Sequence, residues 1–425
     1  MSLIYSYLTS TINRISDGFQ KSFLFTSIFS ILNFIEDQWI NSYFKRFYPD
    51  ENFLSILNKS TILKSQIFNP LILLLVFAIF LILSTIKIFN SLAITLLIAF
   101  VAFFVGAAIL PKYILNKPKN IPKFDSKDIY SIGFCLILIS IVFFGLSIAT
   151  VGGIPLLKPS IRYLLKPAFT MPVFLIIPGT CMVASVYLKK YQEKEITRSH
   201  ARFKFILLLA INTFLLLGLG YRTPILAAFL IIIIMGYYGN IVAPWEVIIG
   251  ALLGVCAIIG IGYFRLIGEQ TIISSASPFS TLQSRADFTL HVLNLLDFIG
   301  GNFGVTHGHL LASSIPGSEL GPRMMVGKLI AWRTEVTVTP TLIGQMIVDF
   351  GKVGVGFGMC FLGLILGIGY KLMKMTKDYF YIGMYSLLLT YTILGVETGI
   401  LDIQVLFYFI IAIFIYLICI IKSRN

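Results

Sequence analysis

The chain has 425 residues, of which 57% are hydrophobic and 12% are charged. A soluble globular chain carries about 25% charged residues, and the mean hydropathy here is +0.90. These values exclude a soluble enzyme, a disordered chain and a small disulfide-rich module, and they predict a membrane protein. In a membrane protein, the net charge of +14 indicates contact with anionic lipid and cytoplasmic loops that are rich in lysine and arginine. Nucleic acid is not expected as a partner, since the basic helix or stacking platform of a nucleic-acid module is not visible.

Residues 1–66 combine aromatic and charged side chains, and their apolar runs are too short to cross a bilayer. The charged region, apolar region and cleavage site of a removable signal peptide are not recognisable there. One or two amphipathic helices on the cytoplasmic membrane surface are expected, and a partly ordered tail is the alternative. The five cysteines lie in apolar stretches without a CxxC spacing, so they give no redox or metal signal.

Beyond residue 66, apolar runs of about 20 residues recur, which is the length that a helix needs to span a bilayer. They predict about ten transmembrane helices, with seven in residues 67–264 and three in residues 348–425, separated by a long loop of residues 265–347. Pro172 and Pro178 should kink the fourth span. The expected spans are 69–88, 91–110, 129–149, 171–188, 204–219, 224–239, 245–264, 348–370, 379–398 and 403–421.

Basic residues set the expected orientation, because cytoplasmic loops carry an excess of lysine and arginine. With ten spans, the lysine-rich loops around residues 112–127, 189–204 and 371–377 fall on the same side as both termini. That side holds about two thirds of the 33 basic residues. We therefore expect a multi-pass protein of the cell membrane with cytoplasmic N- and C-termini and with residues 265–347 outside.

The outer side is enriched in arginine, whereas the inner side carries mostly lysine. A guanidinium makes bidentate hydrogen bonds to phosphate or carboxylate and stays charged when partly buried. This distribution predicts an outward-facing site for an anionic ligand, a phosphate or pyrophosphate. Salt bridges to acidic side chains such as Asp287, Glu319 and Glu335 are the structural alternative. The outer arginines are Arg162, Arg222, Arg265, Arg285, Arg323 and Arg333.

Three outer motifs present an arginine from a turn. In the corner between the fifth and sixth spans, two glycines permit a tight turn and Pro224 restarts the helix, which holds Arg222 at the membrane interface. A charge there is costly unless it is paired or bound to a ligand, although an arginine can also snorkel to lipid headgroups. A glycine turn precedes Arg162 in a basic segment that could touch a lipid phosphate or simply lie on the membrane. A Gly-Pro corner presents Arg323.

The long outer loop adds titratable side chains. His307 and His309 are separated by one glycine, but a cysteine or carboxylate cluster that would complete a metal site is not nearby. A neutral imidazole acting as a base or hydrogen-bond donor is favoured over metal binding, and ordinary loop histidines are the alternative. Arg333 and Glu335 could form a structural ion pair, which would leave Glu335 catalytically idle.

The eighth expected span begins near Asp349, which is three residues before Lys352. This spacing predicts an ion pair on one helix face. Small residues at Gly354, Gly356 and Gly358 should permit close helix packing. P-loop, GxGxxG, GxSxG, HExxH and DxD motifs do not stand where they could work, so a glycosyl transfer enzyme of this kind would use a lipid-linked donor rather than a nucleotide sugar.

The outer motifs, in their order along residues 69–421, resemble those of the Wzy-type O-antigen polymerases, which are oligosaccharide repeat-unit polymerases. The resemblance implies a GT-C-like fold with a long extracytoplasmic loop. It also implies an enzyme without metal, nucleotide or other cofactor that joins polyprenyl-pyrophosphate-linked oligosaccharide units at the outer face. Residues 1–66 lie outside it. The segments that carry the resemblance are Gly152–Leu157, Gly220–Thr223, Pro316–Arg323 and Thr339–Gly351.

The resemblance also implies partners for the protein and roles for individual residues. The partners of such an enzyme would be the lipid-linked oligosaccharide, membrane lipid, and a flippase or chain-length regulator. An O-antigen-ligase-like enzyme would share these features but use another acceptor. A transporter would place polar groups in mid-membrane, whereas the expected spans are nearly free of charge. The candidates are Arg222, Arg323, Arg162 and Arg333 for binding pyrophosphate, and His307, His309 and Glu335 for acid–base catalysis.

Overall fold

The computed structural model describes residues 67–115, 121–157, 161, 164–221, 223–268, 278–315, 317–331, 337–376 and 378–424. Contacts divide the chain into two units, one of residues 68–242 and 247–425 and the other of residues 1–67 and 243–246. The amphipathic segment expected in residues 1–66 lies outside the described residues. Within residues 243–246, the Glu246 carboxylate accepts a hydrogen bond from the Ala243 N–H at 2.5 Å.

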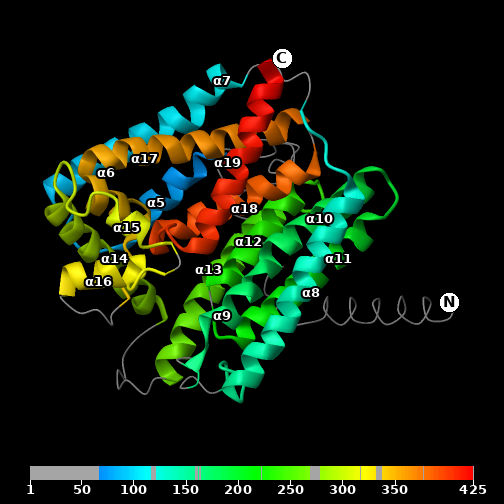
Figure 1. Ribbon diagram of the computed structural model, residues 1–425, viewed down its shortest axis with the longest axis horizontal. Coiled ribbons are helices and arrows are strands. Elements are labelled where there is room, and N and C mark those ends of the chain that lie inside the picture. Colours follow the sequence, from blue (N-terminus) through cyan, green and yellow to red (C-terminus); the bar gives the residue numbers. More distant parts are fainter. Residues whose placement is uncertain are drawn as a thin grey trace, which may run out of the picture. The chain divides into compact units, whose positions relative to one another are not determined.

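The described residues fold into helices joined by turns, and no β-strand occurs within them (Figure 1). Their order is α5 Ile72–Leu83, α6 Asn90–Phe104, the π-helix η2 Val105–Ile109, α7 Leu110–Ile114, α8 Ser126–Val151, α9 Pro167–Thr170, the 3₁₀ helix η4 Met171–Leu175, α10 Ile176–Gln192, α11 Arg198–Gly218, α12 Thr223–Tyr238, α13 Pro244–Gly268, α14 Pro278–Gly300, α15 His309–Ala312, α16 Pro322–Ala331, α17 Thr341–Thr376, α18 Tyr379–Thr398 and α19 Ile403–Arg424.

Seven helical stretches in the described part are long and apolar enough to cross a membrane, which confirms an all-α polytopic membrane protein. Three shorter apolar helices accompany them, and the count of about ten spans stays a prediction. The fourth expected span starts with the 3₁₀ helix η4, which contains Pro172, but α10 continues through Pro178. The long stretches are Asn90–Ile114, Ser126–Val151, Pro167–Gln192, Arg198–Gly218, Thr341–Thr376, Tyr379–Thr398 and Ile403–Lys422; the shorter ones are Ile72–Leu83, Thr223–Tyr238 and Pro244–Gly254.

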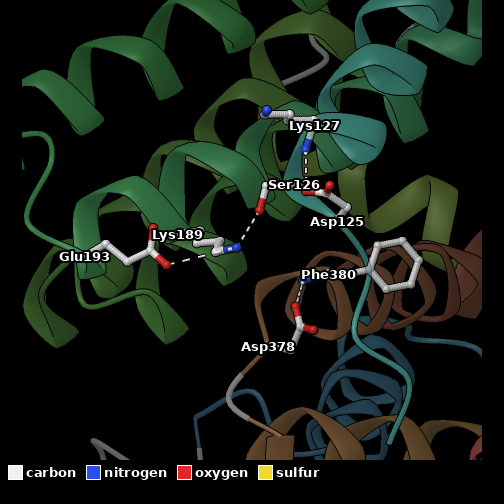
Figure 2. A network of polar contacts seen from close by, with 7 residues as sticks. All are labelled: Asp125, Ser126, Lys127, Lys189, Glu193, Asp378 and Phe380. Atoms are coloured by element: carbon white, nitrogen blue, oxygen red, sulfur yellow. Dashed lines mark hydrogen bonds and ion pairs between the residues drawn. The ribbon is translucent and has the colours of Figure 1, made fainter.

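The beginning of α8, the end of α10 and the beginning of α18 lie close together, as Figure 2 shows. The Asp125 carboxylate caps α8 by accepting a hydrogen bond from the Lys127 N–H at 3.1 Å. Lys189, in the last turn of α10, donates to the Ser126 hydroxyl at 2.6 Å. Asp378 caps α18 in the same way as Asp125 caps α8. Two of the lysine-rich loops and the segment before α18 therefore meet at one end of these helices.

The end of α17 joins the same group. The Lys371 ammonium donates hydrogen bonds to the carbonyl oxygens of Pro111, at 3.1 Å, and of Leu115. The Tyr381 hydroxyl donates to the Pro122 carbonyl oxygen at 3.0 Å. The loops that the charge pattern assigns to the cytoplasmic side thus lie at a common end, which we call the lysine-rich end.

Helix α17 and the α6–η2 segment approach each other closely because glycines line their contact. A methyl group at Gly106 would lie 2.1 Å from the carbonyl oxygen of Cys360, and one at Gly363 would lie 2.6 Å from the carbonyl oxygen of Phe103. Both distances are far below van der Waals contact. The backbones can approach this closely only where side chains are missing, as in other tightly packed membrane helices.

Replacing Gly106 by Ala should therefore destabilise the fold. The added methyl group collides with the α17 backbone, and overpacking of this kind costs about 1–3 kcal/mol. The matched control is Gly145→Ala in α8, where no atom lies within 4 Å of the added carbon. We expect a lower melting temperature for Gly106→Ala and an unchanged or higher one for Gly145→Ala in detergent or nanodiscs. Equal melting temperatures for the two variants would contradict this packing.

Candidate functional site

Helix α17 is broken at Gly351, whose φ of 63° and ψ of −154° lie outside the helical region. This conformation favours glycine because it has no Cβ. The site is also crowded, since a Cβ here would lie 2.2 Å from the carbonyl carbon of Asn302. The break therefore requires glycine both for its backbone conformation and for the close approach of the loop that follows α14.

That loop, residues 301–308, satisfies the backbone groups that the break exposes. The N–H groups of Val305 and Thr306 donate to the Val348 carbonyl oxygen at 2.8 and 3.2 Å, and the His307 N–H donates to the Asp349 carbonyl oxygen at 3.0 Å. In return, the Lys352 N–H donates to the carbonyl oxygen of Gly301 at 3.2 Å. An unpaired buried backbone group is costly, so these bonds fix the loop to the break.

Asp349, the second residue before the break, holds α15. Its side chain is buried, with 3% exposed. One carboxylate oxygen accepts hydrogen bonds from the Thr306 hydroxyl at 2.5 Å and from the N–H groups of Gly308 and Leu310 at 3.0 Å each. The other accepts from the Leu311 N–H at 2.9 Å. A carboxylate at a helix N-terminus satisfies N–H groups that lack helical partners.

The predicted ion pair between Asp349 and Lys352 is wrong. It assumed a continuous helix, but Gly351 breaks the helix between the two residues and the carboxylate turns toward α15. The spacing of Asp349 and Lys352 is typical of a surface ion pair, but here Asp349 is buried and caps α15.

The segment expected as an outer loop contains α14, α15 and α16, and these helices share a hydrophobic core with α17 and the corner between α18 and α19. The core gives this part of the molecule a packed interior of its own, so the functional side chains stand on ordered elements. Its buried members are Val292, Leu296, Leu310, Val326, Val338, Val348 and Leu401.

Polar contacts connect α14 to the corner between α5 and α6. The Asp287 carboxylate accepts from the Ser84 hydroxyl and the Thr85 N–H, both at 2.6 Å. These hydrogen bonds, the Ser84 one foremost, lower the pKa of the Asp287 carboxyl below its usual value. Buried Asp297 accepts from the Thr95 hydroxyl at 2.6 Å. Helix α14 is therefore fixed along its length.

Two of the outer arginines form ion pairs at the corner between α18 and α19. Arg323 contacts Asp402 at 2.5 Å, and Arg285 pairs with Glu397. Both pairs are partly exposed, with 32% of the Arg323 side chain and 39% of the Asp402 side chain accessible. Burial raises the pKa of the Asp402 carboxyl, and Arg323 opposes that rise by favouring the carboxylate form.

Two cavities lie on either side of α15. The first is an apolar groove of about 600 Å³ between α17 and α19, with Leu311 of α15 at its margin. The second is a polar cavity of about 350 Å³, and its lining includes His309 and Ala312 of the same helix. Because Asp349 fixes α15, one buried carboxylate determines the wall between them. The rest of the polar cavity is formed by Ser313, Ser318, Glu319, Leu320 and Met325.

The structure brings only some of the candidate residues together. His307 and His309 are both exposed, but only His309 lines the polar cavity, and His307 has a positive φ of 48°. Arg323 lies two residues before Met325 of that cavity and pairs with Asp402. No group of three His, Cys, Asp or Glu side chains in the described ranges could hold a metal ion. The remaining candidates, Arg162, Arg222, Arg333 and Glu335, lie outside the described residues.

Sequence reasoning missed two groups that organise the site. The spacing from Lys352 predicts an ion pair for Asp349, whereas the glycine two residues after Asp349 in an otherwise regular span is a signal for a break. Asp402 was not considered, although an acidic residue between two apolar spans needs a partner. Its partner, Arg323, is 79 residues away in the chain, so the pairing has no local signal.

Replacing Asp349 by Asn should loosen α15. Hydrogen bonds to a charged group contribute about 1.5–3 kcal/mol, and an amide cannot accept all four. We expect backbone amides of residues 305–313 to exchange with deuterium at least about tenfold faster, because each 1.4 kcal/mol is a factor of ten. Asp125→Asn at the lysine-rich end is the control and should leave this segment unchanged. Unchanged exchange in Asp349→Asn would contradict the role of the carboxylate.

Comparison with known proteins agrees with this architecture. The model of the family described as "Putative O-antigen polymerase" matches residues 66–409. An uncharacterised protein of Methanocaldococcus jannaschii is 29% identical over 302 residues, which cover 70% of this chain and 79% of the relative. No solved structure matches the chain significantly. The family match covers most of the transmembrane helices, the broken helix α17, the polar cavity and most of the apolar groove, and the chain therefore belongs to the O-antigen polymerase family.

Proposed function

We propose that this protein polymerises oligosaccharide units that are carried on polyprenyl pyrophosphate, at the outer face of the cell membrane. The family supports a membrane glycan polymerase. The observation that carries the finer proposal is the polar cavity that contains His309 and Glu319 and adjoins the α16 segment bearing Arg323. His309 is a potential base, and Arg323, two residues before Met325 of the cavity, is a candidate cation for a phosphate leaving group.

The position of the cavity supports action at the outer face. It is formed by α15, α16 and the turns between them, whereas the loops with most lysine gather at the start of α8 and at the ends of α10 and α17. If the lysine-rich end faces the cytoplasm, the cavity faces outward and both termini are cytoplasmic. A lipid-linked donor would then remain in the bilayer with its sugars at the cavity.

The proposed reaction transfers a glycan from pyrophosphate to a sugar hydroxyl. The acceptor oxygen forms a bond to the anomeric carbon of the donor, and the bond from that carbon to the pyrophosphate oxygen breaks. The electron pair of the broken bond leaves with the polyprenyl pyrophosphate. The hydroxyl proton passes to a base, for which His309 is the described candidate that lines the cavity. His307 and Glu335 stay alternatives for this role.

Arg323 would stabilise the charge that develops on the leaving pyrophosphate. Asp402 contacts one terminal nitrogen of its guanidinium. This contact orients the side chain, and the other N–H donors of a guanidinium give it the capacity to bind an anion as well. Arg222, Arg162 and Arg333 remain candidates for further phosphate contacts. A flippase that delivers the donor and a chain-length regulator are the proposed partners.

An extension assay tests the reaction. Purified protein in nanodiscs receives a polyprenyl-pyrophosphate oligosaccharide from its own host, without nucleotide sugar, and the products are resolved by size. A ladder at repeat-unit intervals is expected. Transfer to a different acceptor without a ladder would instead indicate a ligase, and movement of intact donor across the bilayer would indicate a transporter. Both outcomes contradict the proposal.

Variants at the cavity test the roles of its residues. Arg323→Ala should reduce extension by about 10²–10³-fold, which is the usual loss when one transition-state donor is removed. Arg285→Ala is the matched control, because Arg285 also pairs with an acid at the α18–α19 corner. His309→Ala should cost about 10²–10⁴-fold, as for other general bases, and exposed His291 of α14 provides its control. Equal losses in Arg323→Ala and Arg285→Ala would indicate a structural role only.

A further inference from the structure

We infer that the apolar groove between α17 and α19 binds the isoprenoid tail of the lipid-linked donor. This inference rests on the proposed function and names a site for the part of the substrate that does not react. The groove encloses about 600 Å³, within the range of about 300–1,000 Å³ that is usual for ligand sites. Figure 1 shows α17 and α19 running in different directions, and residues of both helices line the groove.

The walls of the groove are almost entirely hydrocarbon. Helix α17 contributes Val353, Phe357 and Phe361, and α19 contributes Phe409 and Ile410. Glycines at positions 354 and 358 also line the groove, where a Cβ would lie 2.4 Å from the Phe350 Cβ and 2.5 Å from the Met346 sulfur, respectively. Within a bilayer such a surface offers no hydrogen-bonding groups, so its occupant is apolar, and van der Waals packing decides how tightly that occupant binds.

The part of the groove beyond the break at Gly351 matches one leaflet of a bilayer in length. A helix rises about 1.5 Å per residue, so the wall from Val353 to Ile365 extends for about 18 Å. The hydrocarbon core of a bilayer is about 30 Å thick, which gives about 15 Å for each leaflet. Phe357 and Ile410 are strongly exposed, with 76% and 61% of their surface accessible. A tail could therefore enter sideways from the bilayer while its headgroup stays at the interface.

The other end of the groove is polar, which favours the binding of a lipid headgroup there. Gln345 lines it with only 4% of its surface exposed. Within the described residues, its side-chain oxygen has no hydrogen-bond partner, and a buried polar atom without a partner is unfavourable. Ile400 and Leu401 also line this end, and the next residue is Asp402, the partner of Arg323. A lipid in the groove would thus carry its phosphates toward a cation.

A single branched chain fits these features better than an ordinary phospholipid. The groove is one continuous space, and a diacyl lipid would have to place its second tail outside it. The aromatic and branched side chains of its walls leave irregular spaces that the methyl branches of an isoprenoid can fill, and such shape complementarity adds contacts that a straight chain lacks. Arg323, whose ion-pair partner Asp402 follows Leu401 of the groove, complements the negative charge of an isoprenoid phosphate.

Filling the groove should impair extension. Ile410→Trp enlarges a side chain that lines the groove, and its neighbour Ile411→Trp makes the same change at a residue that does not line it and is 44% exposed. We expect at least about tenfold slower extension at limiting donor for Ile410→Trp, as for other steric changes in an apolar pocket. Ile411→Trp should behave as the unmodified protein. Equal rates for two folded variants with matching melting temperatures would overturn the inference.

Photo-crosslinking tests the occupant without relying on a variant. The unmodified protein in diacyl phospholipid nanodiscs is irradiated with a polyprenyl phosphate that carries a diazirine in its tail. We expect label on peptides of residues 341–376 and 403–424, reduced by unlabelled polyprenyl phosphate and not by phosphatidic acid. Absence of label there, or equal competition by phosphatidic acid, would overturn the inference.

The two experiments separate this inference from the proposed function. Specific label in the groove without a ladder in the extension assay would support the tail site and contradict the polymerase reaction. A normal ladder with no specific label, and with full activity of Ile410→Trp, would support the polymerase reaction and overturn the tail site.

Discussion

The break in α17 at Gly351 is the constraint on which the outer part of the molecule depends. It frees backbone carbonyl oxygens that the loop of residues 301–308 then satisfies, and it directs the Asp349 carboxylate toward the N–H groups of α15. A continuous helix would pair these carbonyl oxygens internally. The loop would then lose its anchor, and α15 would no longer separate the polar cavity from the apolar groove. The positions of His309 in the polar cavity and of Leu311 at the margin of the groove depend on this one break.

The corner between α18 and α19 carries the second constraint. Glu397 and Asp402 pair with Arg285 of α14 and Arg323 of α16, so two helices of the outer segment are connected to one short corner. Ile400 and Leu401 of the same corner line the groove. In the proposed mechanism, phosphate binding at Arg323 and tail binding in the groove therefore involve neighbouring residues of one corner. Exposed ion pairs contribute little to stability, which fits a role in orienting Arg323 rather than in holding the fold.

Several features could be predicted because they are local. The apolar runs, the lysine-rich loops and the resemblance of the outer motifs gave a polytopic membrane protein of the O-antigen polymerase family, and the family match confirms it. His309 is a candidate base because it lies in the long outer loop, and the structure places it in the lining of a cavity. The polar partners could not be predicted in this way. The four hydrogen bonds of Asp349 reach residues 38 to 43 positions away, and such pairings depend on how the chain folds back.

The sequence by itself determined that this chain is a membrane protein, because the length and hydrophobicity of an apolar segment decide whether it inserts as a helix, almost independently of its neighbours. It also determined the motifs that identify the family. Only the tertiary structure decided that Asp349 caps a distant helix, that Asp402 holds Arg323 and that a groove opens between α17 and α19. These features arise from contacts between segments far apart in the chain, and the physical reason is that a buried polar group takes whichever partner the packing of the helices brings within reach.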